Sequence, residues 1–591
     1  MSAGSRIFLG IALVSLTVSI PPLSRDAAAQ GLQPEGGETQ VNTYTTDAQR
    51  DARPSIAADG SFVVVWESFT QDGDTYGVFG RAFDASATPT AQFQINEFTT
   101  AYQQDVRAAA LNGGGFVVVW ESDEADGDSY GVRARLLDAN GQLAGSEFAI
   151  NTFTTGSQGD PDVEPRPDGG FVVAWESEGP DGDNKAIVVR RFDSVGGSLG
   201  AENLVNTYVT GNQQDPAIAR LDDGRFVVAW DSYGQDGSYG AVIGRLLDSD
   251  AQPIGTEFQL NAYTSQSQDD VDVAALGGGG FVVAWESYQQ IGTFTAIIGR
   301  RYDSLGVALG PEFVVEDGAT NYQYDPNIAR EPGGGFVVVW EGDDADGYGI
   351  LARRFDVQGQ PRGTRFVVNT TELNEQQFND HGHVATNVAG ELVVAWGSEG
   401  IDGDGYAAMI QRFTISACEE EPQAGCLAAG KAKLQIKNLA DDGKDQIKWG
   451  WIKGDAFDQT AIGAPTVDTS YTLCVYDSSG GVDTIATSLT IQASASWQDK
   501  SPKGAKYKDK VGISDGAIGG LLKPGAAGKA KVNVKAKGNA IPMPTPVAPG
   551  QYFEQDTTVT VQLVNREGTC WTSAFTTNKK NSSDKFVAKA P

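Results

Sequence analysis

The residues best suited to chemistry in this chain are aspartates that recur in the pattern Asp-Gly-Asp. They follow closely on an apolar run that ends in tryptophan, as in GGFVVVWESDEADGDSYG at residues 114–131. Carboxylates at this spacing are candidate metal ligands, with calcium as the candidate cofactor. The candidates are Asp72, Asp74, Asp126, Asp128, Asp181, Asp183, Asp236, Asp402 and Asp404. Turn formation is the favoured alternative, because glycine accepts positive φ, aspartate caps turns, and the D-x-D-x-D-G spacing of a calcium loop is missing.

A Gln-x-Asp motif precedes each of the first six tryptophans of these runs, with its aspartate fifteen residues ahead. We predict that this motif binds a ligand where the chain enters the innermost strand of each unit, at the mouth of a central channel. Its members are Gln49, Asp51, Gln103, Asp105, Gln158, Asp160, Gln213, Asp215, Gln268, Asp270, Gln323 and Asp325, and the seventh unit has Asn379-Asp380-His381 instead. Carboxylates at one mouth repel each other unless they are hydrogen-bonded, solvated or bridged by a cation. The alternative is that both residues hydrogen-bond the backbone of neighbouring units.

Two further sets of charged residues accompany these motifs. An acid follows most of the tryptophans, and we expect it to stay solvated on the same face and to share cations with the loops: Glu67, Glu121, Glu176, Asp231, Glu286 and Glu341. An arginine recurs three residues before an aspartate on the third strand, where we expect structural ion pairs. These arginines are Arg81, Arg135, Arg190, Arg245, Arg300 and Arg353.

We predict no catalytic residue. The chain has two histidines, His381 and His383, which we expect in a loop, and their D-H-G-H pattern supplies neither a nucleophile with its base nor a zinc site. The glycines are expected in turns rather than in a phosphate-binding loop. Carboxylates are so numerous that no pair stands out as that of a glycosidase. The sequence therefore predicts a protein that is not an enzyme.

The elements that position these residues repeat with the tryptophans. Trp66, Trp120, Trp175, Trp230, Trp285, Trp340 and Trp396 are spaced by 54 to 56 residues. Each unit predicts four short strands, as at 216–221, 226–230, 241–247 and 257–261, and the second strand is apolar on both faces, so each tryptophan is expected in the core between sheets. The predicted fold class is all-β, with a seven-bladed β-propeller over residues 37–415. Residues 37–46, GETQVNTYTT, match a fourth strand, and we expect them to complete the last blade and close the ring.

A second domain is predicted after this array. The formal charge of the chain is −33, yet from Cys418 onward 21 basic residues outweigh 18 acidic ones. Lysines alternate with apolar residues in KAKLQIK and KAKVNVKAK, which is the period of half-buried strands. We expect a linker over residues 416–430 and a smaller β-sandwich-like domain over residues 431–591. The lysine stripe is expected to be a solvated strand face, with attraction to an anionic surface such as lipopolysaccharide as the alternative.

The N-terminus and the cysteines indicate export. A basic residue, an apolar run and small residues predict a signal peptide over residues 1–29, and no later segment has the ~18–20 apolar residues of a membrane span. Four cysteines predict two disulfides, for which we expect the pairs Cys418–Cys426 and Cys474–Cys570. We predict a secreted or cell-surface protein, extracellular or periplasmic. Its strongly acidic first domain argues against nucleic acid as a partner.

The motifs GGFVVVWES, DGDxYG and NTYTT resemble repeats of large exported bacterial proteins, and the lysine-rich end resembles a C-terminal module that recurs in such proteins. The first resemblance implies a propeller-type architecture, often beside calcium-binding or adhesion-type modules. We predict a monomeric, non-enzymatic binding or adhesion protein with an acidic, calcium-binding propeller face, whose partner is a protein or glycan at the cell surface. The alternative is a polysaccharide-binding or polysaccharide-degrading propeller that uses the aromatics Tyr44, Phe98, Phe153, Tyr208 and Tyr263.

Overall fold

The structure is a computed structural model of the chain. It describes residues 32–590 apart from 126, 317–320, 333, 344–346, 371–375, 379–382, 416–417, 419–421, 441, 467–468, 481, 492–493, 495, 511, 513, 515, 540, 545, 557 and 566–568. The expected signal peptide, Asp126 and the Asn379-Asp380-His381 motif therefore lie outside the described residues. Within the described part, no helix is long and apolar enough to cross a membrane.

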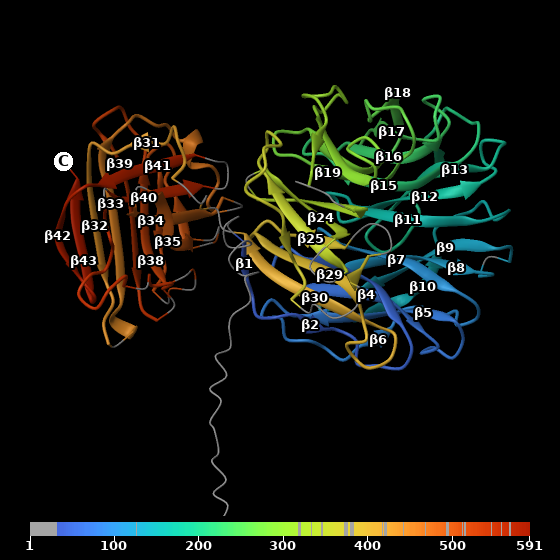
Figure 1. Ribbon diagram of the computed structural model, residues 1–591, viewed down its shortest axis with the longest axis horizontal. Coiled ribbons are helices and arrows are strands. Elements are labelled where there is room, and N and C mark those ends of the chain that lie inside the picture. The colour runs from blue at the N-terminus through green and yellow to red at the C-terminus, as the bar shows by residue number, and fades with distance from the viewer. Residues whose placement is uncertain are drawn as a thin grey trace, which may run out of the picture.

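Up to Ile415 the strands form small antiparallel sheets arranged in a propeller-like ring, whose chain order runs from blue to yellow in Figure 1. Six sheets have four strands each, hydrogen-bonded in chain order. The first strands are β3 (Gln49–Ile56), β7 (Gln103–Ala110), β11 (Gln158–Pro165), β15 (Gln213–Arg220), β19 (Gln268–Ala275) and β23 (Tyr324–Arg330). The second strands are β4 (Phe62–Phe69), β8 (Phe116–Asp123), β12 (Phe171–Glu178), β16 (Phe226–Tyr233), β20 (Phe281–Tyr288) and β24 (Phe336–Asp343).

The third and fourth strands complete these sheets toward the outside of the ring. The third strands are β5 (Tyr76–Phe83), β9 (Tyr130–Leu137), β13 (Lys185–Phe192), β17 (Gly240–Leu247), β21 (Thr295–Tyr302) and β25 (Tyr348–Phe355). The fourth strands are β6 (Phe93–Gln94), β10 (Leu143–Ala149), β14 (Asn203–Leu204), β18 (Pro253–Gln259), β22 (Phe313–Val314) and β26 (Phe366–Val367). First strands of neighbouring sheets pack against one another, as β3 does with β7 and β15 with β19, so they line the centre.

The seventh sheet joins the two ends of this array. It contains β27 (Gln376–Gln377), β28 (Val384–Thr386), β29 (Glu391–Glu399) and β30 (Tyr406–Ile415), together with β1 (Leu32–Pro34) and β2 (Thr39–Gln40) from the N-terminus. Both N-terminal strands pair with β30, in the register Leu32↔Ile415 and Gln40↔Met409. Asn42 adds a hydrogen bond, because its Oδ1 accepts from the backbone N–H of Ala408 at 3.0 Å.

Apolar side chains fill the space between neighbouring sheets. All seven repeat tryptophans are fully buried, and the valines and alanines before them on the second strands are buried on both faces of the sheet. Clusters of core residues run from one sheet to the next, as where Trp120 packs with Val63 and Val65 of the sheet before it. The expected core position of the tryptophans is confirmed.

The repeated arginines of the third strands connect sheets in a different way from the expected ion pairs. Arg81 Nη1 donates to the carbonyl oxygen of Val41 at 3.0 Å, and Arg245 Nη1 donates to that of Val205 at 2.6 Å. Arg135, Arg190, Arg300 and Arg353 repeat this contact with the sheet before them. The expected acceptor was wrong, because each guanidinium receives the backbone carbonyl of the residue that directly follows the outer strand of the preceding sheet. Arg135 also forms an ion pair, to Glu97 at 2.8 Å.

Two larger sheets follow Ile415 and lie beside the ring in orange and red in Figure 1. One has the order β31 (Leu427–Ala428), β41 (Cys570–Phe575), β40 (Val559–Asn565), β34 (Tyr471–Ser479) and β35 (Val482–Ile491). The other has the order β36 (Trp497–Asp499), β37 (Ala505–Lys508), β38 (Ala517–Lys523), β39 (Ala530–Lys537), β33 (Gln446–Gly454), β32 (Lys431–Lys437), β43 (Lys585–Ala590) and β42 (Asn578–Ser582). Short 3₁₀ turns η1 (Asp442–Lys444) and η2 (Thr460–Ile462) connect strands, and the two sheets share one buried core around Trp449, Trp451 and Trp571.

Two disulfides tie the segment after β30 to the first of these sheets. They join Cys418 to Cys474 and Cys426 to Cys570, with Cα–Cα distances of 5.5 and 4.8 Å. The expected pairs Cys418–Cys426 and Cys474–Cys570 were wrong. Strand β40 lies between β34 and β41, so Cys474 and Cys570 are two strands apart, about 10 Å, and each takes a partner from the incoming segment instead. Leu427 and Ala428, in the range expected as linker, already pair with β41.

We predict that the N-terminal strands stabilise the whole ring. A chain that begins at Asp47 loses the pairs with β30, the buried Val41 and the Asn42 hydrogen bond, and should melt at least about 5 °C lower than a chain that begins at Leu32. Differential scanning calorimetry measures both. Equal melting temperatures would mean that β1 and β2 contribute nothing to closure.

Candidate functional site

The Gln-x-Asp motif lies where each first strand begins, at one end of the central channel. In each of the first six sheets the pairing of the first and second strands shifts register across this motif, as between Arg50 and Arg53 or between Gln214 and Ala217. The six aspartates have φ between 45° and 53°, a left-handed conformation that is uncommon outside glycine and that a bulge accommodates. The bulge turns the aspartates out of the ladder and, in four of the sheets, directs the aspartate N–H toward the preceding sheet, at Asp105, Asp160, Asp270 and Asp325.

The glutamines of the motif hold the local loops together. Gln49 Nε2 donates to the carbonyl oxygens of Thr46 and Asp47, and its Oε1 accepts from Asn42 Nδ2 at 2.8 Å. The glutamine of the second sheet also accepts from the indole of its sheet, Trp120 Nε1 to Gln103 Oε1 at 3.2 Å. All six glutamines are fully buried. They therefore hold the loops at the mouth of the channel in place.

The acids that follow the tryptophans accept hydrogen bonds from backbone N–H groups of Gln-x-Asp aspartates in the next sheet. Asp105 N–H donates to Glu67 Oε1 at 2.6 Å, and Asp160 N–H donates to Glu121 Oε1 at 2.8 Å. Asp270 and Asp325 donate in the same way to Asp231 and Glu286, each at 2.8 Å. We call each such meeting of two sheets a junction. The expectation that these acids stay solvated was wrong, because the bulge of the next sheet covers Glu67, Glu121, Glu176, Asp231 and Glu286, which are at most 7% exposed.

Carboxylates crowd at the junctions. Ligand oxygens of Asp105, Glu121 and Asp160 lie within 4.8 Å of one another, and the same holds for Asp160, Glu176 and Asp215 and for Asp215, Asp231 and Asp270. Asp269, Asp270 and Glu286 form a fourth group of this kind. Burial, followed by the charge of the neighbouring aspartates, raises the pKa of Glu67, Glu121, Asp231 and Glu286 well above the usual range. Each junction thus concentrates negative charge where water is largely excluded.

Two junctions contain a cationic side chain of the chain itself. At the first, Arg50 Nε lies 3.0 Å from Glu67 Oε2 and 3.5 Å from Asp51 Oδ2. At the third, the ammonium group of Lys185 pairs with Glu176. Lys185 is the only lysine before Cys418, so its place beside a buried glutamate accounts for this departure from the arginine-only composition of the repeats.

The described Asp-Gly-Asp aspartates accept hydrogen bonds that join adjacent loops. The first aspartate of a pair accepts from the asparagine that follows the fourth strand, as Asp72 Oδ2 does from Asn96 Nδ2 at 2.8 Å. The second accepts a backbone N–H of the next loop, as Asp74 Oδ2 does from Ala101 at 2.9 Å. Asp181, Asp183, Asp402 and Asp404 repeat both contacts. None of these aspartates belongs to the groups of close acidic ligands found among the described residues.

The seventh sheet keeps the scaffold of the motif but not its carboxylate. Trp396 Nε1 donates to Gln376 Oε1 at 2.9 Å, so Gln376 occupies the glutamine position three residues earlier than the spacing of the other units indicates. Phe378 takes the aspartate position, and its backbone N–H donates to Glu341 Oε2 at 3.2 Å. His383, expected in a loop, is buried instead, with Nδ1 2.9 Å from the carbonyl oxygen of Ala52 and its ring stacked on Phe378.

Tyrosines that the sequence analysis did not single out lie beside the junction acids. Tyr76 stacks under the guanidinium of Arg50, 4.1 Å from its ring centre, and contacts Tyr102. Burial and nearby acids raise the pKa of Tyr130 and Tyr324 to about 12. Tyr76 and Tyr130 are the tyrosines of DGDxYG motifs, and each begins a third strand. This recurrence was the sequence signal that could have pointed to aromatic side chains beside the junction acids. The aromatics expected to bind sugars, Tyr44, Phe98, Phe153, Tyr208 and Tyr263, are only half-exposed.

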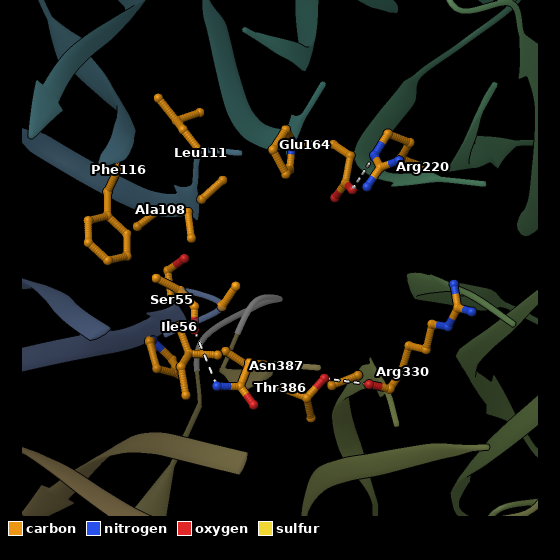
Figure 2. Close-up of a pocket in the computed structure, with 18 of the residues that line it drawn as sticks. Ser55, Ile56, Ala108, Leu111, Phe116, Glu164, Arg220, Arg330, Thr386 and Asn387 are labelled. Carbon is orange, nitrogen blue, oxygen red and sulfur yellow. Dashed lines mark hydrogen bonds and ion pairs between the residues drawn. The ribbon is translucent and has the colours of Figure 1, made fainter. Parts of the chain in front are cut away.

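A cavity of about 780 Å³ opens at the other end of the first strands (Figure 2). Small residues such as Ala108, together with Ile56 and Leu111, form much of its wall. Its charged groups pair with one another: Glu164 lies 4.0 Å from Arg220, and Arg330 donates to Asp222 at 2.5 Å. Burial raises the pKa of Glu164 to about 8 despite Arg220. The cavity extends the channel and adds no convergent group of unpaired reactive side chains among the described residues.

A positively charged surface covers one face of the larger C-terminal sheet. Alternate residues of β32, β33 and β39 point into the core, as do Leu434, Trp449 and Val534. The intervening positions carry lysines, which we call the lysine face: Lys431, Lys433, Lys437, Lys448, Lys506, Lys508, Lys523, Lys531, Lys535, Lys537, Lys585 and Lys589. The six strands β37, β38, β39, β33, β32 and β43 contain no aspartate or glutamate.

Lysines of this face stand directly opposite one another on neighbouring strands. The pairs include Lys433↔Lys589, Lys437↔Lys585 and Lys448↔Lys535. Like charges in such pairs destabilise a sheet. Partial burial and the ammonium groups of Lys437 and Lys535 lower the pKa of Lys448, and those of Lys579 and Lys433 lower the pKa of Lys589. The repulsion is therefore not relieved by carboxylates of these strands.

No family model and no curated protein matches the chain. Among solved structures, a protein of unknown function from Dyadobacter fermentans is similar over 65% of this chain and 100% of its own, with 11% identity and a TM-score of 0.38. An ulvan lyase covers 65% of this chain and 96% of its own at 7% identity and a TM-score of 0.39. An α-L-arabinanase of Penicillium chrysogenum covers 64% and 99% at 12% identity and a TM-score of 0.35. Likenesses this weak indicate neither activity nor ligand.

We predict that the buried junction acids make stability fall as pH rises in the presence of a chelator. The pKa of Glu121 is higher in the folded than in the unfolded chain, where it is near 4.5, so the two states differ in bound protons only above that pH. The variant Glu121→Gln stays neutral and keeps an acceptor for Asp160 N–H. It should match the wild type at pH 4 and be more stable by about 1–2 kcal/mol at pH 8.

Thermal unfolding followed by circular dichroism from pH 4 to pH 8 measures this difference, with Glu124→Gln, at an exposed glutamate, as the control. If Glu121→Gln were no more stable than the wild type at pH 8, the junction carboxylate would not be a source of electrostatic strain.

Proposed function

We propose that this protein is an exported, non-enzymatic binding protein that holds an anionic polysaccharide on its lysine face. The lysine face carries the proposal, because it gathers one sign of charge on a flat sheet while the rest of the chain is strongly acidic. In the same proposal, the sheets up to Ile415 are the seven blades of a closed propeller over residues 37–415, followed by a sandwich-like domain.

The spacing of the lysines suits a long, regularly charged polymer. Alternate residues of a strand lie about 7 Å apart and neighbouring strands about 4.8 Å apart, so the six strands form a two-dimensional array of ammonium groups. A linear polyanion laid across β39, β33 and β32 would contact Lys433, Lys448 and Lys535 together, and it would relieve their mutual repulsion. Such binding releases counterions and weakens as salt increases.

The remaining features agree with a binding role outside the reducing cytoplasm. Two disulfides, Cys418–Cys474 and Cys426–Cys570, are typical of proteins in oxidising compartments. The junctions repeat similar acids around the channel, whereas a reaction centre needs one convergent set of dissimilar groups. The calcium predicted for the propeller fits this role as a structural ion and needs no catalytic step.

We predict that reversing three charges of the lysine face weakens the binding of an anionic polysaccharide. The triple variant Lys433→Glu, Lys448→Glu and Lys535→Glu should bind heparin or polygalacturonate at least tenfold more weakly than the wild type at about 50 mM salt. Its melting temperature should be unchanged or higher, because it removes opposed lysines. The variant Lys500→Glu, Lys503→Glu and Lys510→Glu makes the same change of net charge at exposed lysines outside the face.

Binding is measured by biolayer interferometry with immobilised polysaccharide, with neutral dextran as the blank and duplex DNA as the competitor. Equal loss in both triple variants would mean that net charge alone governs binding. Tighter binding of duplex DNA than of either polysaccharide would contradict a glycan partner.

A further inference from the structure

Among the described residues, the junction between the fourth and fifth sheets has no internal cation like those at the first and third. Residues at the same register define the comparison. Arg50 pairs with Glu67 across β3 and β4, whereas Gln214 pairs with Asp231 across β15 and β16. Lys185 begins β13, whereas Gly240 begins β17. The fourth sheet therefore has a neutral amide and a glycine at the two positions from which a cation reaches the junction acid elsewhere.

The same junction holds a buried oxygen for which the described residues supply no hydrogen-bond partner. Asp231 is 4% exposed, and its Oδ2 accepts the backbone N–H of Asp270 at 2.8 Å. Its Oδ1 is buried and has no hydrogen-bond partner among the described residues. A buried carboxylate oxygen without a partner is costly, because desolvation is not repaid. The position requires a ligand or a proton.

The geometry of the three carboxylates favours a metal ion. Oxygens of Asp215, Asp231 and Asp270 lie within 4.8 Å of one another. Calcium binds oxygen at about 2.4 Å, so two of its ligands are at most about 4.8 Å apart. Asp231 also replaces the glutamate of the other junctions, and the shorter side chain leaves more room in front of its carboxylate. Carboxylates are the ligands that hard divalent cations prefer.

We propose that Asp215, Asp231 and Asp270 bind a hard divalent cation, such as calcium, at the junction of the fourth and fifth sheets. The ion bridges two sheets, since Asp215 and Asp231 belong to the fourth and Asp270 to the fifth. It takes the place that Arg50 and Lys185 take at their own junctions. This cation site is independent of the lysine face, which belongs to other sheets, and it differs from the Asp-Gly-Asp loops.

The test uses the full chain, freed of metal with a chelator and titrated with calcium chloride at pH 7.5 in an isothermal titration calorimeter. The variant Asp231→Asn should bind one calcium ion fewer than the wild type, or bind that ion at least tenfold more weakly. The melting temperature of the wild type should rise with calcium, because an ion held by the folded state stabilises it, and this rise should shrink in the variant. The matched control is Glu176→Gln, at the junction that Lys185 neutralises, which should bind calcium as the wild type does.

A second variant covers the case in which Asp231→Asn does not fold. Gln214→Arg places a guanidinium at the register of Arg50, so it should abolish this calcium site while melting at least as high as the wild type in chelator. Calcium binding unchanged in either variant would overturn the proposal. So would a wild type that binds no calcium at pH 7.5, because Asp231 would then be satisfied by a proton.

Discussion

One hydrogen bond governs the arrangement of the channel mouth: the backbone N–H of a Gln-x-Asp aspartate donates to the carboxylate that follows the tryptophan of the preceding sheet. At 2.6 to 2.8 Å it joins neighbouring sheets at the channel mouth, in addition to their apolar contacts and to the arginine–carbonyl hydrogen bonds of the third strands. The N–H reaches its acceptor because the aspartate adopts a left-handed φ at a bulge. The same bulge covers the acceptor and brings a second carboxylate close to it. Sheet-to-sheet register and crowded negative charge therefore have a common origin.

The negative charge is compensated in a different way from one junction to the next. Arg50 and Lys185 supply a cation at the first and third junctions, and Phe378 removes one carboxylate where the sixth and seventh sheets meet. At Asp231 the described side chains neither supply a cation nor replace a carboxylate, and we propose that a metal ion binds there. The C-terminal sheets present the opposite problem, since the lysine face gathers positive charge that its own strands leave unbalanced. In both regions charges of one sign repel one another, and a bound partner of opposite charge would relieve that repulsion.

The sequence was sufficient for features that depend on a local period. The spacing of the tryptophans indicated the repeating strands and the buried core. The match of GETQVN to a fourth strand indicated that this segment pairs with the last sheet. There the carboxylate of Glu38 accepts the backbone N–H of Thr370, just as that of Glu257 accepts the backbone N–H of Thr207. Other features could not be predicted, because they depend on how deeply a side chain is buried or on the order of strands in a sheet. The bulge that buries Glu121 adds one residue to the strand, and the alternation of polar and apolar residues in the sequence does not reveal it. The disulfides follow from β40 lying between β34 and β41, and the lysine face appears only when strands far apart in the chain become neighbours.

The central claim is that the junction of the fourth and fifth sheets, where the described side chains supply no cation, obtains its positive charge from an ion. Crystals of the full chain grown with manganese chloride test it most directly, through an anomalous difference map at the manganese edge. We expect a peak among the carboxylates of Asp215, Asp231 and Asp270, and no peak beside Glu67, where Arg50 already lies. A map without a peak at Asp231, or with equal peaks at both junctions, would contradict the account.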